Sequence, residues 1–236
     1  MTTSDTKIRD TSRIIARWVF RETMGLVMLA LFLFIPAGRW DWGWGWAYVA
    51  VMTVWVIATG LVVIPRYPRL LAERLNPSRA SKKWDKAIMG FVGVLVLAGY
   101  VIAGLDERYG WTTSITPTLQ WAALILTAAG YALTVWATAS NAFFSLIVRI
   151  QTERGHTVAT GGPYRFIRHP SYLGQIAQYL AVPVMLGSGW AALIGAATAL
   201  LILLRTALED GTLQTELPGY KEYAADVRFR LIPGVW

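Results

Sequence analysis

Residues Pro170–Leu204 read PSYLGQIAQYLAVPVMLGSGWAALIGAATALLILL and contain no charged side chain. The run is longer than the roughly 20 residues that one membrane-spanning helix requires. Gly187-Ser188-Gly189 interrupts it near the middle, and small turn-forming residues of this kind typically end a helix. The run therefore predicts a hairpin of two short helices that crosses the membrane and returns, so that both open ends lie on the same face.

The rest of the chain favours an all-α, polytopic membrane protein. Of its 236 residues, 55% are hydrophobic and 15% are charged, whereas soluble domains carry about 25% charged residues. A fourth helix that starts near Thr118 and continues to about 148 is longer than a bilayer core, so we expect its end to protrude or bend at the interface. With the hairpin and three further uncharged runs, it gives about six transmembrane helices. These three runs are Thr23–Gly38, Trp42–Pro65 and Ala87–Leu105.

The basic residues indicate the orientation. With both termini in the cytoplasm, every Lys and Arg except Arg39 and Arg108 lies on the cytoplasmic side, as the positive-inside rule favours. We therefore attribute the net charge of +8 to cytoplasmic loops rather than to a nucleic-acid site, and we expect a location in a bacterial inner membrane. Residues 7–21 alternate basic and apolar side chains, which predicts an amphipathic helix at the membrane surface.

Polar residues gather at the open ends of the predicted hairpin. The stretch GGPYRFIRHPSYLG, Gly161–Gly174, leads into it, and RTALEDGTLQ follows from Arg205. Alone, each piece has a plainer explanation, as a cytoplasmic anchor, a helix start or a solvated face. Their convergence on one face of the membrane indicates a binding site instead. The converging side chains are Tyr164, Arg165, Arg168, His169, Tyr172, Arg205, Glu209 and Asp210, joined by Asn141, Phe143, Phe144, Arg149, Glu153 and His156.

This combination of side chains suits a zwitterionic, nucleotide-like cofactor. Arginine and histidine bind carboxylates or phosphates, acidic pairs bind an ammonium or ribose hydroxyls, and aromatic faces bind a flat base or a cation. S-adenosylmethionine (SAM) carries a base, a ribose, a carboxylate, an ammonium and a sulfonium. We expect no metal, because no ligand spacing repeats, and Gly161-Gly162 is not a dinucleotide fingerprint, because no strand precedes it.

Two segments carry a family resemblance: GHTVATGGPYRFIRHPSYLG (155–174) and RTALEDGTLQTELPGYKEYAADVRFRLIPG (205–234). Together they resemble the isoprenylcysteine carboxyl methyltransferases and, more loosely, the phospholipid N-methyltransferases. Asp210 departs from the family pattern, since a second Glu is usual there, and Gly211 stands where bacterial relatives tend to carry a basic residue. The matching residues are His156, Pro163, Tyr164, Arg168, His169, Pro170, Tyr172, Gly174, Arg205, Glu209, Asp210, Leu213, Tyr220, Tyr223 and Pro233.

The resemblance covers about residues 141–236 and divides the chain there. Residues 1–140 would contain the amphipathic helix and transmembrane helices 1–4, and residues 141–236 a catalytic core with a cofactor-binding loop, the hairpin and a C-terminal helix. The resemblance implies a SAM-dependent methyltransferase with its pocket at the cytoplasmic face. Its acceptor would be a lipophilic carboxylate, amine or thiol, an isoprenoid or a lipid, that enters from the bilayer. The implied cofactor-binding residues are Gly162, Pro163, Tyr164, Arg168, His169, Pro170, Tyr172, Gly174, Glu209 and Asp210.

Three residues are candidates for catalysis. Arg205 resembles the arginine that the family places near the acceptor carboxylate. It lies four residues before Glu209, on the same helical face, so a simple Arg205–Glu209 ion pair is the plainer alternative. A carboxylate acceptor is already ionised at neutral pH. An amine or thiol acceptor would benefit from a base, and Glu153 or His156 is the candidate for that role.

Two other functions are consistent with the sequence. One is an NADPH-dependent membrane reductase related to the sterol reductases, which share a similar cytoplasmic C-terminal pocket. Its 2′-phosphate would require additional arginines there. The other is a non-enzymatic membrane scaffold or sensor, which would bind no cofactor.

Overall fold

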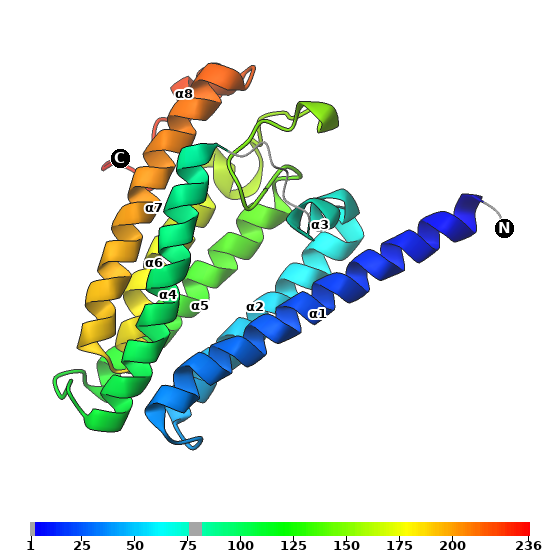
Figure 1. The fold of residues 1–236 in the computed structure, drawn as a ribbon. Helices are drawn as coiled ribbons and strands as arrows, with labels where there is room; N and C mark the ends of the chain where they lie inside the picture. Colours follow the sequence, from blue (N-terminus) through cyan, green and yellow to red (C-terminus); the bar gives the residue numbers. More distant parts are fainter. Residues whose placement is uncertain (1–2, 76–81) are drawn as a thin grey trace.

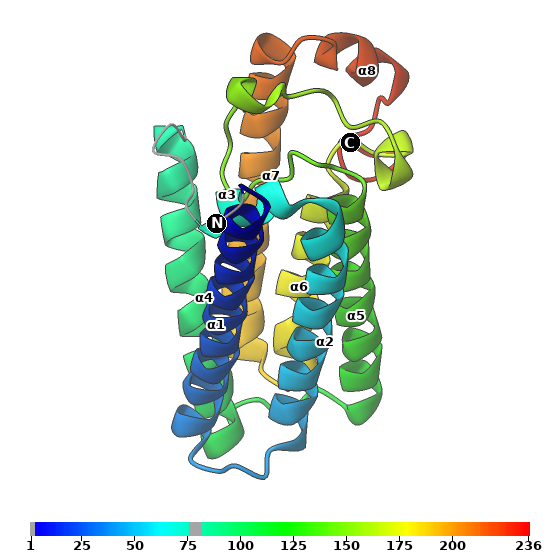
Figure 2. The same ribbon diagram turned by 90° about the vertical axis from the view of Figure 1, so that its right-hand side faces the viewer.

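The structure, a computed structural model, describes residues 3–75 and 82–236. Over this part of the chain it consists of helices and loops without a strand, which confirms the all-α fold. The helices are α1 (Thr3–Ala37), α2 (Gly43–Arg66), α3 (Pro68–Leu75), α4 (Lys83–Tyr109), α5 (Pro117–Ala139), α6 (Pro170–Met185), α7 (Gly189–Glu216) and α8 (Tyr220–Asp226), with 3₁₀ turns η1 (Thr152–Arg154) and η2 (Gly162–Arg165). Helices α4, α5, α6 and α7 pack together, while α1 and α2 lean away from them towards the N-terminus (Figure 1). The short helix α8 and the loop before α6 lie together at one end (Figures 1 and 2).

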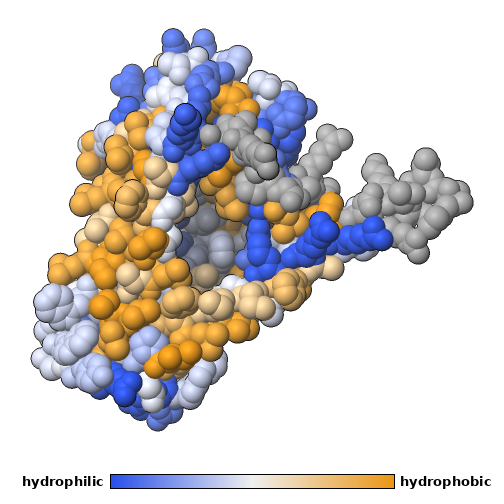
Figure 3. Space-filling model, viewed as in Figure 1, coloured by the Kyte–Doolittle hydropathy of each residue, from blue (hydrophilic) through white to orange (hydrophobic). Residues whose placement is uncertain are grey.

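Five of these helices are long and apolar enough to cross a membrane: Thr11–Ala37 of α1, and all of α2, α4, α5 and α7. Helix α6 has 16 residues, fewer than the roughly 20 of a full span, and it packs against both α5 and α7. The apolar surface lies over the middle of the bundle, while polar residues lie at its ends (Figure 3). The polytopic membrane fold is thus confirmed, with the sixth expected helix present as a shorter segment.

Helix boundaries differ from the expected ones at the N-terminal end and in the hairpin. The amphipathic segment 7–21 and the first span form one continuous helix, α1, because no turn-forming residue separates them. In the hairpin, α7 is not a short helix: it continues well beyond Leu204 to Glu216. Arg205, Glu209 and Asp210 therefore all belong to one helix, which extends from the membrane span into the polar end of the bundle.

The fourth span does not continue to about 148; α5 ends at Ala139. The Ser140 N–H donates to the carbonyls of Trp136 and Ala137, at 3.1 and 3.2 Å, which closes the last turn. The Asn141 side chain then accepts a hydrogen bond from the Phe143 N–H at 2.8 Å. This turn, which Asn favours because its side chain mimics a backbone carbonyl, directs the chain away from the helix axis and into the loop that precedes α6.

The expected hairpin is present, and contacts at its tip fix its position. Gly187 adopts a positive φ of 82°, which favours glycine. Ser188 caps α7 by accepting from the Ala191 N–H at 3.0 Å, and it donates to the buried Asp106 of α4 at 2.6 Å. At the other end of α6, Gly174 crosses α5 at Gly130 with no space for a side chain. The two open ends of the hairpin therefore meet at the loop end of the bundle.

We expect the two ends of α4 to lie on opposite faces of the membrane. The expected cytoplasmic segment 66–86 includes residues 76–81, among them Arg79, which lie outside the described residues. Lys83 and Arg108, both exposed at opposite ends of α4, are therefore the positions to test. The chain has no cysteine, so Lys83→Cys and Arg108→Cys each introduce a single label site.

A membrane-impermeant maleimide should label one of these variants in intact cells and the other only after permeabilisation. Labelling of both from the same side would contradict the span count.

Candidate functional site

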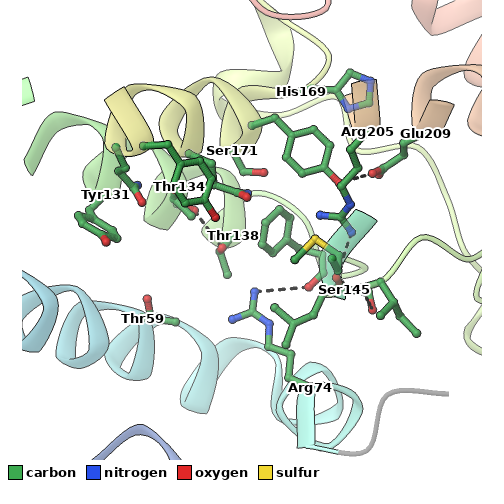
Figure 4. Close-up of a pocket in the computed structure, with 18 of the residues that line it drawn as sticks. Thr59, Arg74, Tyr131, Thr134, Thr138, Ser145, His169, Ser171, Arg205 and Glu209 are labelled. Carbon is green, nitrogen blue, oxygen red and sulfur yellow. Dashed lines mark hydrogen bonds between the residues drawn. The ribbon is translucent and has the colours of Figure 1, made fainter. Parts of the chain in front are cut away.

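One cavity of about 720 Å³ extends from the membrane-embedded part of the bundle to its loop end. Its membrane-embedded part is lined by aromatic and hydroxyl side chains, including Trp55 and Thr59 of α2 and Tyr131 of α5. Its loop end is lined by His169, at the start of α6, and by Glu209 of α7 (Figure 4). The surface is also hollowed between α1 and the rest of the bundle (Figure 3). The polar site around His169 and Glu209 and the membrane-embedded part around Trp55, called the chamber below, therefore form one continuous space.

Asp210 organises the loop end of the bundle without lining the cavity. Its side chain is completely buried and accepts two hydrogen bonds from Arg168, at 2.8 and 3.1 Å. Through Arg168, Tyr220 and Arg230 it joins α7 to the turn before α6, to α8 and to the C-terminal segment. This arrangement positions other side chains, whereas the expected direct contact with a cofactor stays a prediction for Asp210. Its remaining partners are Arg230 at 2.8 Å, Gln214 at 2.8 Å, Tyr220 at 3.0 Å and His169 at 3.1 Å.

Arg168 lines the cavity, but its hydrogen-bond donors are occupied. Besides Asp210, it donates to the backbone carbonyls of Val227 and Arg228 at 2.9 and 2.8 Å. Burial alone would lower the pKa of Arg168, but its hydrogen bonds to Asp210 and the charge of that carboxylate outweigh burial and raise the pKa. Arg168 therefore remains charged and holds the C-terminal segment in place.

Glu209 is the available carboxylate of the site. It lines the cavity, and the Tyr172 hydroxyl donates to one of its oxygens. The Tyr172 ring in turn stacks on His169, with 5.7 Å between ring centroids and 7° between planes. Within the described part of the chain the second oxygen of Glu209 has no hydrogen-bond donor, so it can accept from a ligand beside the rings of Tyr172 and His169.

Arg205 pairs with Asp85 of α4, not with Glu209 as the plainer alternative predicted. Its Nε donates to Asp85 at 2.7 Å, and Nη2 donates to the Leu146 carbonyl at 3.1 Å. Asp85 also accepts from the Val148 N–H at 2.8 Å. The pair therefore fastens residues 146–148 over the cavity, which Arg205 lines with its guanidinium 5.1 Å from the Tyr172 ring centroid.

His156 and Glu153, the two candidate bases, occupy different environments. His156 lines the cavity, and its ring lies 4.7 Å from the Phe143 ring. Burial, followed by the charges of Arg154 and Arg149, lowers the pKa of His156 to about 4. The Glu153 side chain is 56% exposed, pairs with Arg149 and does not line the cavity, so His156 is the better placed of the two candidates.

The remaining predicted cofactor residues have structural places. Tyr164 lines the cavity, and its hydroxyl accepts from Asn141 at 3.3 Å. Four others do not line it. Gly162, with a φ of 57°, packs against Ser140, while Pro163 and Pro170 begin η2 and α6. Gly174 lies in the α5–α6 crossing. These residues shape the turn that presents Tyr164, Arg168 and His169.

Sequence reasoning missed Asp85 and Arg74. Asp85 lies just before the apolar run at Ala87, flanked by Lys83 and Lys86, and therefore resembles an ordinary acidic residue in the first turn of a helix. Arg74 is one of several basic residues in a cytoplasmic segment, where positive charge is expected anyway. Only helix packing brings both to the cavity region.

The Arg205–Asp85 pair yields a prediction about stability. In Asp85→Asn, the buried Arg205 would lose its counter-charge, so we expect the free energy of unfolding to fall by about 3–5 kcal/mol. Thermal unfolding in detergent measures this change. The matched control is Asp41→Asn, because Asp41 is 77% exposed beside Arg39 and should leave the unfolding temperature unchanged. Equal effects of the two variants would refute the assigned role.

The lowered pKa of His156 yields a prediction about pH. The folded protein favours the neutral imidazole, so this contribution to stability is complete above the ordinary pKa of 6.5 and is lost as the pH falls towards 4. His156→Gln should lose less stability across this interval than the unmodified protein. Thermal unfolding at a series of pH values tests this, and an identical loss in both proteins would contradict it.

Comparison with known proteins adds a family likeness. The model of the isoprenylcysteine carboxyl methyltransferase (ICMT) family matches residues 121–215, from α5 to near the end of α7. A solved structure of the eukaryotic intramembrane Ras methyltransferase ICMT aligns over 100% of this chain and 88% of its own, with 14% sequence identity and a TM-score of 0.59. No curated protein sequence matches. At that identity the structural match establishes the fold. Together with the family match over residues 121–215, it confirms the expected resemblance to the ICMT family.

Proposed function

We propose that the chain transfers a methyl group from SAM to a lipophilic acceptor, an isoprenoid or lipid that carries a carboxylate, amine or thiol. The observation that carries this proposal is the continuity of the cavity. It joins a polar end, with His169, Tyr172 and Glu209, to a chamber between membrane helices lined by residues such as Trp55. A polar cofactor and an apolar acceptor can therefore meet in one space.

The side chains at the polar end fit SAM. The free oxygen of Glu209 suits the ammonium group. Two aromatic pairs, the stacked rings of His169 and Tyr172 and the tilted rings of Phe143 and His156, offer faces for the adenine ring and the sulfonium. When bound, SAM supplies an electrophilic methyl group on its sulfonium.

The protein's part in such a reaction is alignment and the exclusion of water. Asp210 fixes Arg168 and His169, and the Arg205–Asp85 pair holds residues 146–148 across the cavity. His156 has a pKa of about 4, so it is a weak base at neutral pH. This favours an acceptor that is already ionised, namely a carboxylate, over an amine or a thiol.

The alternative reductase fits the site less well. An NADPH 2′-phosphate requires arginines with free donors. In the described part of the chain, four of the five arginines that line the cavity are paired with a carboxylate, which leaves Arg74 alone with free donors. The paired arginines are Arg21, Arg149, Arg168 and Arg205. A scaffold or sensor, in turn, gives no account of the continuous cavity.

The proposed reaction takes place at the cytoplasmic face of a bacterial inner membrane, with both termini in the cytoplasm. The distribution of basic residues supports this orientation. The residues that line the polar end of the cavity belong to the start of α6 and to α7, and Figure 2 shows the loop end of the bundle, where α7 and α8 meet.

Glu209→Ala and His169→Ala test the cofactor site. Each should weaken SAM binding about ten- to a hundredfold. Glu209→Ala removes a charge-assisted contact with the ammonium group, and His169→Ala removes a ring face for the cofactor. Isothermal titration of the purified protein in detergent measures this. The matched control is Glu216→Ala, on the same helix but bound to Lys82 and remote from the cavity lining, and its affinity should not change.

Transfer itself is tested with methyl-labelled SAM and a membrane lipid extract. Label should appear in the organic phase with the unmodified protein and disappear with Glu209→Ala. Unchanged SAM affinity in both site variants would refute the shared cofactor site.

A further inference from the structure

Arg74, in the short helix α3, is a buried cation that the proposed cofactor site does not use. Its side chain is 7% exposed and lines the cavity. Figure 4 shows it reaching into the cavity from α3, on a different side from Arg205 and Glu209. The same cavity therefore receives a second polar group, away from the hairpin ends.

The Arg74 guanidinium has few partners. Its Nε is buried without a hydrogen bond, and Nη2 makes one long contact, 3.4 Å to the Phe144 carbonyl. The Phe144 ring lies 5.2 Å away. No carboxylate among the described side chains comes within 4.0 Å of its nitrogens.

The other arginines that line the cavity are all paired with a carboxylate in the described part of the chain. These pairs are Arg21 with Glu22, Arg149 with Glu73, Arg168 with Asp210 and Arg205 with Asp85. Arg74 thus differs from them in having no acidic partner, although it is as deeply buried as Arg168.

Such an arrangement costs stability. An arginine removed from water without a counter-charge is unfavourable, and in membrane proteins such residues usually serve a function. Burial, and next the charge of Arg21, lower the pKa of Arg74 to about 10, so it stays cationic at neutral pH. The nearest acid on α1, Glu22, is already held by Arg21 at 3.2 Å.

Arg74 also lies within electrostatic reach of the cofactor end. Burial is the main cause that raises the pKa of Tyr164, while the charge of Glu209 raises it and that of Arg74 lowers it. Tyr164 therefore lies near both charged groups. A ligand bound at Arg74 would be in the same part of the cavity as one bound at Glu209.

We propose that Arg74 binds the anionic group of the lipophilic acceptor. This inference rests on the proposed function and assigns to Arg74 the acceptor contact that the sequence suggested for Arg205. The planar guanidinium presents paired donors that match a carboxylate or a phosphate, and the chamber below it accommodates the apolar chain. The anion replaces the carboxylate partner that the other arginines already have.

The test measures binding of charged and uncharged versions of one ligand, without requiring catalysis. Farnesoic acid and its methyl ester form one pair, and phosphatidic acid and diacylglycerol of equal chain length form the other. The proteins are the unmodified chain, Arg74→Met, Arg74→Lys and the control Arg66→Met, since Arg66 is exposed and does not line the cavity. Quenching of tryptophan fluorescence reports binding, because Trp18 and Trp55 line the cavity.

We expect the unmodified protein and Arg66→Met to bind the acid of one pair at least about tenfold more tightly than its neutral partner. Arg74→Met should remove this preference. Arg74→Lys should retain part of it, because charge remains while the planar fork is lost. If Arg74→Met loses the preference for farnesoic acid over its methyl ester, the acceptor carries a carboxylate. If it loses the preference for phosphatidic acid over diacylglycerol, the anion is a phospholipid phosphate.

The proposal is overturned if the unmodified protein distinguishes neither pair, or if Arg74→Met retains the full preference. Without ligand, Arg74→Met should unfold at the same temperature or higher, since an unpaired buried charge is removed. If Arg74→Met does not fold, an undiminished preference in Arg74→Lys overturns the proposal. The proposed methyl transfer is tested separately, so SAM binding with an intact preference in Arg74→Met would reject this inference alone.

Discussion

The loop end of the molecule depends on one buried carboxylate. Asp210 accepts hydrogen bonds from Arg168 and Arg230 and contacts His169 and Tyr220. These partners come from three segments besides α7, which carries Asp210, and an unpaired charge at this depth would be strongly unfavourable. The turn before α6, the end of α7, α8 and the C-terminal segment are therefore held in one arrangement. The side chains that face the cavity, His169 and Tyr172 among them, take their positions from it.

A second buried ion pair, Asp85 with Arg205, likewise holds separate segments together beside the cavity. Asp85 binds Arg205 and the Val148 N–H, so α4, α7 and the loop after α5 converge on one carboxylate. Close helix crossings at Gly130, Gly174 and Gly195 bring the backbones of α5, α6 and α7 together, as small residues do in membrane proteins. The buried ion pairs thus hold the loops in place. The glycines allow the close approach of the helices that surround the chamber.

The distribution of paired and unpaired polar groups separates structural from functional candidates. Asp210, Arg168, Asp85 and Arg205 satisfy one another, so they have little capacity left for a ligand. Glu209 keeps a free oxygen, and Arg74 keeps an unpaired Nε. Both face the same cavity, and they have opposite charges. A cofactor with a positive group and an acceptor with a negative group would complement this pair.

Much of the architecture follows from local sequence. The uncharged runs predicted the membrane helices, Gly187–Gly189 predicted the hairpin turn, and the two motifs predicted that Arg168, His169, Tyr172 and Glu209 converge. These predictions held because hydrophobic length and turn-forming residues act over short distances in the chain. The errors arose where local patterns are ambiguous. The uncharged run after Ala139 leaves the helix through an Asn turn, although the fourth helix was expected to continue to about 148. The helix through Arg205 and Glu209 was expected, but it extends further, to Glu216.

The sequence by itself determined the all-α membrane fold, the hairpin and the location of the polar motifs. Only the tertiary structure decided the charge pairing. Arg205 and Glu209 are one turn apart, yet Arg205 binds Asp85, 120 residues away in the chain. Asp210 holds several segments together through its hydrogen bonds. Arg74 has no carboxylate partner among the described side chains, and its Nε has no hydrogen bond. The physical reason is that a buried charge selects its partner among the groups that helix packing brings within about 3 Å, and a linear sequence does not specify those neighbours.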